Sequence, residues 1–237
     1  MPEDFPYLAN PRWALAEQVA ETAQRRFPAE VLAAGVYGSL AHGDDTDASD
    51  IDLIVVTYRA GAGLHPVTRR VDGHLVDLSV IGADDYLRHA RTLSTSWPLA
   101  ADRYLATKPL YDPTSWLDRL RDVHLGRLAE ARGPEFTALA REAWCRAAAA
   151  HARAARLAEW YETDAALLVL GEARLAASTV VGLLTRTYFR NSADAVTRTG
   201  LARAGITELG AALRAQSDEL ATRGRPVDGS VEDLFDR

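Results

Sequence analysis

Two aspartates at the start of an apolar segment are the first candidates for chemistry in this sequence. Asp50 and Asp52 flank the beginning of Ile51–Thr57, whose composition predicts a buried strand. Residues two apart on a strand project from one face, so we expect the carboxylates side by side and the alternate residues in the core: Ile51, Leu53 and Val55. Adjacent carboxylates repel unless a cation lies between them, and such oxygen ligands suit Mg²⁺. Alternatively, both aspartates only keep the strand end solvated.

A third carboxylate and a glycine-serine turn extend this pattern. Asp77 stands in the middle of the predicted strand His74–Ile81, where an unpaired carboxylate would be costly to bury. Gly38 and Ser39 follow another predicted strand, and the turn that they open could hold a phosphate on its backbone N–H groups. A plain turn with Ser39 as helix N-cap fits the same residues. Three carboxylates facing a phosphate-binding turn are what two-metal phosphoryl or nucleotidyl transfer requires.

Other polar and aromatic residues are weaker candidates. His42 lies inside the turn, where it could approach a phosphate or remain exposed without a role. The aspartates of the following loop are expected to be solvated: Asp44, Asp45 and Asp47. The tryptophans are expected to pack in the core rather than to bind a ligand: Trp97, Trp116, Trp144 and Trp160.

The elements that would position these residues follow from the spacing of apolar side chains. A helix is predicted from Asn10, a suitable N-cap, to about Arg26, and a short helix should follow Ser39. Asp72-Gly73 predicts a hairpin turn. Short apolar runs bounded by glycine and aspartate predict the strands Val31–Val36, Ile51–Thr57, Val67–Val71 and His74–Ile81. Residues 1–112 therefore predict a mixed α/β domain.

The second half of the sequence has a different pattern. Alanine-, leucine- and arginine-rich stretches with a period of 3.6 residues predict the helices Ser115–Glu130, Glu135–Trp160, Asp164–Tyr188 and Ile206–Thr222. Residues 113–237 therefore predict a helical bundle, with a loosely held tail after Arg223. The chain as a whole is expected to be an α+β protein, in which an N-terminal mixed sheet with helices precedes a C-terminal helical domain.

Composition narrows the class of partner and compartment. A chain of 237 residues with 48% hydrophobic and 25% charged residues predicts a packed protein, and a net charge of -6 argues against binding DNA. A single cysteine, Cys145, fits a reducing cytoplasm. Met1–Pro6 lacks the basic region of a signal peptide, and no apolar run approaches the roughly 20 residues that span a bilayer. We therefore expect a cytoplasmic protein without a membrane or DNA partner.

The order and spacing of these residues resemble the nucleotidyltransferase superfamily related to DNA polymerase β. The resemblance rests on Gly38-Ser39, nine further residues, Ser49-Asp50-Ile51-Asp52 and the strand aspartate Asp77. A weaker similarity to kanamycin (aminoglycoside) nucleotidyltransferases extends, with gaps, over about residues 31–199. It implies transfer of a nucleoside monophosphate from ATP or another NTP to a hydroxyl of an aminoglycoside antibiotic, with release of pyrophosphate. Such antibiotic-resistance chemistry needs a nucleotide and a small cationic substrate.

The resemblance also implies metal and phosphate ligands. Asp50 and Asp52 would bind Mg²⁺ with help from Asp77, and Gly38 and Ser39 would hold the outer phosphates.

The general base of this family is a glutamate on the first long helix of the second domain, one turn before a basic residue that touches the nucleotide. Glu142 and Arg146 fit this spacing, although an exposed i,i+4 ion pair would explain it as well. Glu135 is the second candidate for the base. The family often builds its site across a two-fold axis, so a homodimer is expected.

Two other functions stay open at this point. The first is a minimal nucleotidyltransferase that modifies a protein or tRNA, as an antitoxin does; Arg146 and His151 match an Arg-x4–6-His ribonuclease spacing, but short motifs of this kind arise by chance. The second is a degenerate domain that binds nucleotide as a sensor or scaffold. The intact set of Asp50, Asp52 and Asp77 speaks against it.

Overall fold

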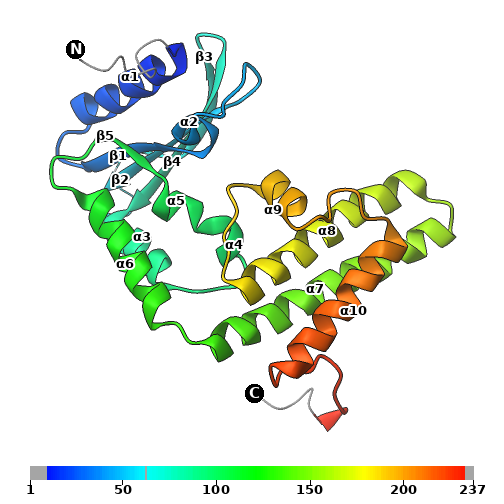
Figure 1. The fold of residues 1–237 in the computed structure, drawn as a ribbon. Helices are drawn as coiled ribbons and strands as arrows, with labels where there is room; N and C mark the ends of the chain where they lie inside the picture. Colours follow the sequence, from blue (N-terminus) through cyan, green and yellow to red (C-terminus); the bar gives the residue numbers. More distant parts are fainter. Residues whose placement is uncertain (1–9, 62, 233–237) are drawn as a thin grey trace, which may run out of the picture. The chain divides into compact units, whose positions relative to one another are not determined.

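The computed structural model describes residues 10–61 and 63–232 and divides the chain into two compact units (Figure 1). The first unit comprises the residues up to Thr92 together with Asp102–Glu130, and the second comprises Leu93–Ala101 together with the residues from Ala131 onward. The first unit contains a five-stranded sheet and the second is helical, so the expected α+β fold class is confirmed. Met1–Pro6, on which the expectation about a signal peptide rests, lies outside the described residues.

A mixed sheet forms the centre of the first unit. Its order is β3-β4-β2-β1-β5, with β2 and β4 parallel and the other neighbours antiparallel. The strands are β1 (Val31–Tyr37), β2 (Ile51–Thr57), β3 (Val67–Val71), β4 (His74–Gly82) and β5 (Lys108–Tyr111). Four of them confirm the predicted runs. β5 was not predicted; it contains Pro109, which has no backbone N–H, and an edge strand tolerates proline because no donor is needed on its open side.

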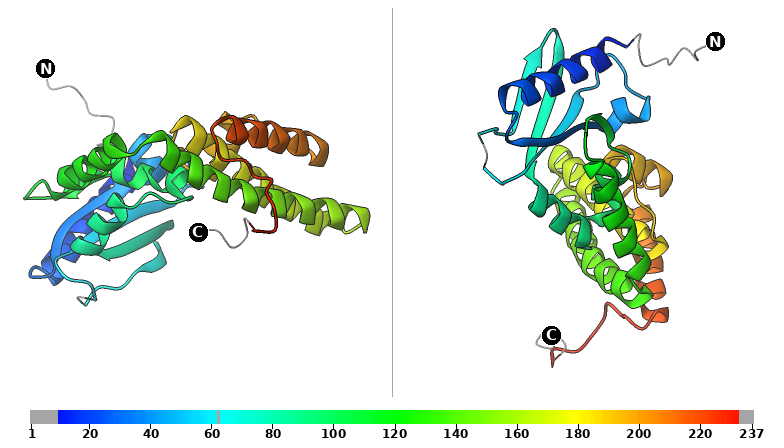
Figure 2. Two further views of the ribbon diagram at one scale, coloured as in Figure 1. Left: turned by 90° about the horizontal axis from the view of Figure 1, so that it is seen from below. Right: turned by 90° about the vertical axis from the view of Figure 1, so that its left-hand side faces the viewer.

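Helices cover both faces of this sheet. α1 (Pro11–Arg26) packs on one face, in a buried cluster with Ile51 and Leu53 (Figure 2). α3 (Ala83–Arg91) and α6 (Trp116–Glu130) pack on the opposite face, against Ile54 and Val56. The alternation along β2 therefore divides its side chains between two cores, as period-two spacing predicts. The short helices α2 (Gly38–His42) and α5 (Asp102–Leu105) complete the first unit.

A helical hairpin forms the core of the second unit. α7 (Gly133–Glu159) and α8 (Thr163–Thr185) lie side by side (Figures 1 and 2). Their contact is lined by buried alanines, which allow the two backbones to approach closely: Ala147, Ala150, Ala154, Ala173 and Ala177. α10 (Ile206–Thr222) adds Leu209 and Leu213 to the same cluster, and α4 (Trp97–Ala100) contacts α8. The predicted long helices are thus present.

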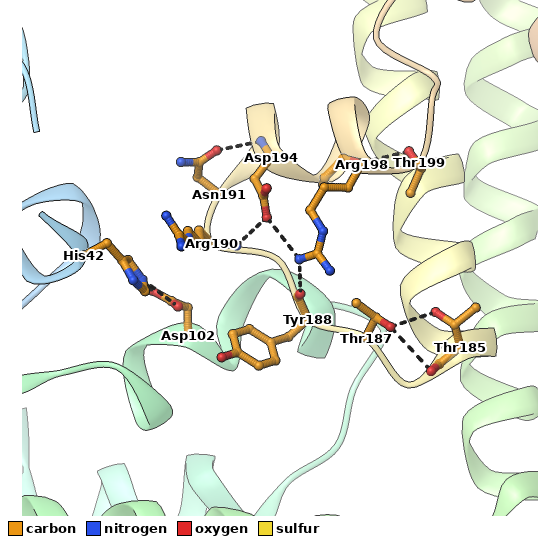
Figure 3. A network of polar contacts seen from close by, with 11 residues as sticks. His42, Asp102, Thr185, Thr187, Tyr188, Arg190, Asn191, Asp194, Arg198 and Thr199 are labelled. Atoms are coloured by element: carbon orange, nitrogen blue, oxygen red, sulfur yellow. Dashed lines mark hydrogen bonds and ion pairs between the residues drawn. The ribbon is translucent and has the colours of Figure 1, made fainter. Parts of the chain in front are cut away.

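A short helix, α9 (Ser192–Arg198), was not predicted (Figure 3). Asn191 caps it, because its side-chain Oδ1 accepts a hydrogen bond from the Asp194 N–H at 2.8 Å. The Asp194 carboxylate accepts from the Arg190 N–H at 3.1 Å and pairs with Arg198 at 3.5 Å. An asparagine cap followed by an acidic first turn is a helix start signal, so the local sequence does encode this helix.

α8 departs from the expectation that no segment could span a membrane. Within residues 10–61 and 63–232 it is the one helix that is long and apolar enough to cross a bilayer by length and composition. Half of its most apolar stretch is buried inside the structure, where α8 packs on α7. Core helices pass the same test, so this property is weak evidence for a membrane.

The tryptophans follow the packing prediction with one exception. Trp97 and Trp116 are buried, and Trp144 packs beside α10 while its Nε1 donates to the Leu213 carbonyl at 2.8 Å. Trp160 is 63% exposed, and the Arg156 guanidinium lies 5.4 Å from its ring centroid. The prediction is wrong for Trp160 because α7 ends one residue before it, beyond the hairpin contact.

The tail after α10 is held more firmly than expected. Arg223 donates from Nη1 to the Leu184 carbonyl at 2.9 Å, and Arg141 donates from Nε to the Pro226 carbonyl at 2.8 Å. The chain is therefore tied to α7 and α8 as far as Pro226.

Candidate active site

The candidate site is a row of polar residues that crosses the sheet of the first unit, and we call it the carboxylate row. Asp52 on β2 lies opposite Tyr37 on β1 and opposite Asp77 on β4, and Asp77 in turn lies opposite Thr68 on β3. Residues paired across strands share a face, so the two carboxylates are direct neighbours. Asp50 immediately precedes β2, two residues before Asp52. Sheet register therefore brings together aspartates that are 25 residues apart in sequence.

Asp52 is held in an environment that resists its ionisation. Burial, and after it the nearby charges of Asp50 and Asp77, raise the pKa of Asp52 to about 6, and the positive charge of Arg103 opposes the rise. A carboxylate that is desolvated and repelled by two others gains stability from a cation placed among them. The electrostatics thus fit a cation-binding site with oxygen ligands.

Gly38 lies against the Asp52 carboxylate. Its φ of +70° is in the left-handed region, and a Cβ at this position would lie only 2.2 Å from Oδ2 of Asp52. Only glycine satisfies both conditions, since any side chain would overlap the carboxylate. The missing side chain lets the backbone that begins α2, with Ser39 as its second residue, reach the carboxylate row.

Hydroxyl groups hold both ends of the row. The Thr68 hydroxyl donates to Oδ1 of Asp77, so this carboxylate has a hydrogen-bond partner on the edge strand. The Tyr37 hydroxyl shares a hydrogen bond of 3.4 Å with Ser79, which is two residues beyond Asp77 on the same face of β4. These bonds fix the side chains that flank the two aspartates.

His42, which ends α2, is engaged by a buried carboxylate (Figure 3). Its Nε2 lies 2.9 and 3.1 Å from the two carboxylate oxygens of Asp102, the first residue of α5. The Asp102 side chain is 5% exposed and that of His42 is 18% exposed. One ring nitrogen of His42 is therefore committed to Asp102, and the contact joins α2 to α5.

Asp45 corrects the expectation that the loop aspartates are solvated. Its side chain is 9% exposed and forms an ion pair with the buried Arg12 at 3.0 Å, while Asn10 donates a second hydrogen bond to it at 3.1 Å. Burial alone would raise the pKa of Asp45, but the hydrogen bonds from Asn10 and Arg12 outweigh it and lower the pKa below the ordinary value. Asp45 thus anchors the loop to the start of α1. Asp44 and Asp47 are exposed.

The other predicted residues belong to the second unit. Glu142 and Arg146 on α7 are both exposed and form an ion pair, and Arg146 also donates from Nη1 to the Thr95 hydroxyl at 2.9 Å. Arg146 lines a cavity of about 290 Å³ whose walls are mainly apolar and which Glu172 also lines. Glu135 lies in the first turn of the same helix.

Within the described parts of the chain, residues 10–61 and 63–232, no three His, Cys, Asp or Glu side chains form a ready-made metal-binding group. The structure therefore pairs Asp52 with Asp77 and places Asp50 two residues from Asp52, without closing them into a preformed cage.

Two residues of the site were not predicted from the sequence: Tyr37 in the row, and Arg103, whose guanidinium lies over the Tyr37 ring. Tyr37 and Arg103 belong to no motif, and they reach the site only through strand register and through the contact of α5 with α2. The one local signal was Tyr37 itself, which stands directly before Gly38.

Comparison with known proteins agrees with this geometry. Residues 16–90 match the family model of the nucleotidyltransferase domain. The matched segment contains Gly38, Asp50, Asp52 and Asp77. The match supports nucleotidyltransferase-type activity, and with it a nucleoside triphosphate as co-substrate.

Two further comparisons, with solved structures and with curated proteins, add no information on the acceptor. A crystal structure of a nucleotidyltransferase-like protein from Exiguobacterium sibiricum aligns with a TM-score of 0.45 and 14% identity, over 87% of this chain and 75% of that chain. No curated protein matches the sequence significantly. Neither result distinguishes an aminoglycoside from another acceptor.

Proposed function

We propose that this chain transfers a nucleoside monophosphate from ATP or another NTP to a hydroxyl of a small cationic acceptor of the aminoglycoside class. The observation that carries the proposal is the pairing of Asp52 with Asp77 across β2 and β4, with Gly38 against Asp52, inside the segment that matches the nucleotidyltransferase domain. A charged row at a glycine turn has the chemistry to receive a metal-bound triphosphate.

Asp50, Asp52 and Asp77 would hold Mg²⁺ in this proposal. Their donors are oxygens only, and a cation would relieve the burial and repulsion that raise the pKa of Asp52. Mg²⁺ is commonly held by one or two carboxylates together with substrate phosphates and water, so a preformed cage of three is not required. When bound, the ion stabilises the negative charge on the phosphate oxygens during transfer.

The residues of the chain divide the remaining work between them. The backbone at Gly38 and Ser39 holds the outer phosphates. The acceptor oxygen attacks the α-phosphorus, a new O–P bond forms, the P–O bond to the β-phosphate breaks, and pyrophosphate leaves. Glu142 takes the proton of the acceptor hydroxyl, and Arg146 offsets phosphate charge. A homodimer in the cytoplasm, with the base and the carboxylate row supplied by different copies, is part of the proposal.

The test is an acceptor panel. The purified chain, Mg²⁺ and ATP or GTP labelled at the α-phosphate should label kanamycin-, neomycin- or tobramycin-type acceptors, and Asp50→Ala should abolish labelling. Transfer to tRNA or to a co-purifying protein, and to no aminoglycoside, would contradict the proposed acceptor and favour the antitoxin-type alternative. Nucleotide binding without any transfer would contradict the enzymatic proposal and favour a sensor or scaffold.

The base is tested separately on whichever acceptor is labelled. Glu142→Gln should lower turnover by about 10²-fold or more, since general-base catalysis contributes roughly that much. Glu135→Gln, on the same helix, is the matched control and should keep near-wild-type turnover. The opposite result would assign the role to Glu135.

A further inference from the structure

The position of Arg103 depends on a contact between α2, which begins at Gly38, and α5. Asp102 precedes it in α5, and the bond of Asp102 to His42 fixes the start of α5 against the end of α2 (Figure 3). The Arg103 carbonyl accepts hydrogen bonds from the Thr107 hydroxyl at 2.6 Å and from the Tyr86 hydroxyl at 3.3 Å. The backbone at Arg103 therefore has little freedom to move.

The Arg103 side chain extends over the ring of Tyr37. Its guanidinium carbon lies 5.2 Å from the ring centroid, a cation–π contact that orients the planar group. Tyr37 lies opposite Asp52 in the sheet and directly precedes Gly38. The guanidinium thus lies over the residue that faces Asp52 and that directly precedes the turn that would hold phosphates.

Among the described residues, no ion pair neutralises the charge of this guanidinium. Across residues 10–61 and 63–232 no carboxylate lies within ion-pair distance of Arg103, and the residue is exposed. Its positive charge nevertheless acts on Asp52: it lowers the pKa of this carboxyl, whereas burial and the two neighbouring aspartates raise it. An arginine that stacks on an aromatic ring keeps its N–H donors available, and guanidinium donors match phosphate oxygens in geometry.

We propose that Arg103 binds the phosphate oxygens of the nucleoside triphosphate, and that His42 is a positioning residue that acts through Asp102 on Arg103. This inference rests on the proposed function and adds residues to its nucleotide site. It replaces direct phosphate binding by His42 with an indirect role. Tyr37 is the platform that keeps the guanidinium in place over the row.

The test is nucleotide binding, measured by calorimetry with Mg²⁺ and without an acceptor. The ligand is the α,β-methylene analogue of ATP or of GTP, whichever the wild type binds more tightly, and the corresponding nucleoside is the comparison. Arg103→Met should weaken analogue binding by about 10-fold or more, because charge-assisted hydrogen bonds are lost, and should leave nucleoside binding unchanged. Arg103→Lys should recover only part of the loss, since a lysine keeps the charge but not the fork.

Arg121→Met is the matched control, because Arg121 is an exposed arginine of the same unit that pairs with Asp118 at 2.9 Å. It should bind the analogue as the wild type does. Equal binding by Arg103→Met and Arg121→Met would overturn the assignment of Arg103 and leave the proposed function standing. Failure of the wild type to bind either analogue would overturn both.

The role of His42 has its own readout. His42→Ala should weaken analogue binding, and His42→Gln, which keeps an N–H donor near the position of Nε2, should restore most of it. Combined with Arg103→Met, His42→Ala should add no further loss, because both changes remove the same contact. Additive losses in the double variant would contradict a role that runs through Arg103.

Discussion

Replacing Asp52 by asparagine should stabilise the fold at neutral pH while removing activity. The pKa of Asp52 in the folded protein is raised to about 6 from an ordinary value of 3.8, mainly by burial and then by Asp50 and Asp77. The folded state therefore holds the proton more tightly than the unfolded state. The stabilisation from the neutral acid is complete below the ordinary pKa and is lost as the pH rises through about 6. Asparagine cannot ionise and escapes this loss.

The magnitude follows from the size of the shift. A difference of about 2 pKa units corresponds to about 3 kcal/mol at pH 8. The carboxylate is partly exposed, and solvent screening reduces this figure to about 1 kcal/mol. In a chain of this length a difference of that size moves the melting temperature by about 2–4 °C.

The assay is urea unfolding of the wild type and of Asp52→Asn between pH 4 and pH 8, with a chelator present. The advantage of the variant should grow by about 1 kcal/mol from pH 4 to pH 8. Asp47→Asn, which changes an exposed carboxylate of the nearby loop, is the control and should show no such growth. An advantage that is the same at both pH values, or a variant that is less stable than the wild type at pH 8, would refute the electrostatic account of the site.

Two other predictions concern packing around the site. Gly38→Ala should destabilise the fold by more than Gly43→Ala and should abolish transfer. Both glycines have positive φ, a conformation that costs an alanine about 1–2 kcal/mol. Only at Gly38 would the new Cβ also overlap Asp52, at 2.2 Å from its carboxylate. Equal losses of unfolding free energy in the two variants would show that the close approach is unimportant. Arg12→Met should cost about 3 kcal/mol or more in urea unfolding, because it leaves the buried Asp45 carboxylate without its partner, and adding Asp45→Asn should recover part of that loss. No recovery in the double variant would contradict the pairing.

Much of the sheet unit could be predicted because its signals are local. β-Branched runs between glycines and aspartates predict the strands, and Asn10 and Pro11 predict the start of α1. Period-two spacing placed Asp50 and Asp52 on one face, and register then set Asp77 beside Asp52. β5 escaped prediction because it has four residues and includes Pro109, so that pairing with β1 alone makes it a strand.

The remaining features depend on contacts between distant segments. In the sequence, Asp45 cannot be distinguished from the exposed aspartates of the same loop, and only the fold brings Arg12 within ion-pair distance of it. Arg103 has no distinguishing signal in the sequence, because its position at the site depends on the bond between His42 and Asp102 and on the ring of Tyr37. No spacing rule connects such residues, because the chain between them folds through several elements first.

If the carboxylate row directs nucleotidyl transfer, and not another use of a nucleotide, the α-phosphate of the NTP is the group that moves to the acceptor. The measurement is a pair of reactions with Mg²⁺ and the acceptor panel, one with NTP labelled at the α-phosphorus and one with NTP labelled at the γ-phosphorus, for the wild type and for Asp52→Asn. We expect that the α-label alone moves to an acceptor, that the γ-label appears in pyrophosphate, and that Asp52→Asn shows neither. Transfer of the γ-label to the acceptor, or transfer that survives Asp52→Asn unchanged, would contradict this expectation.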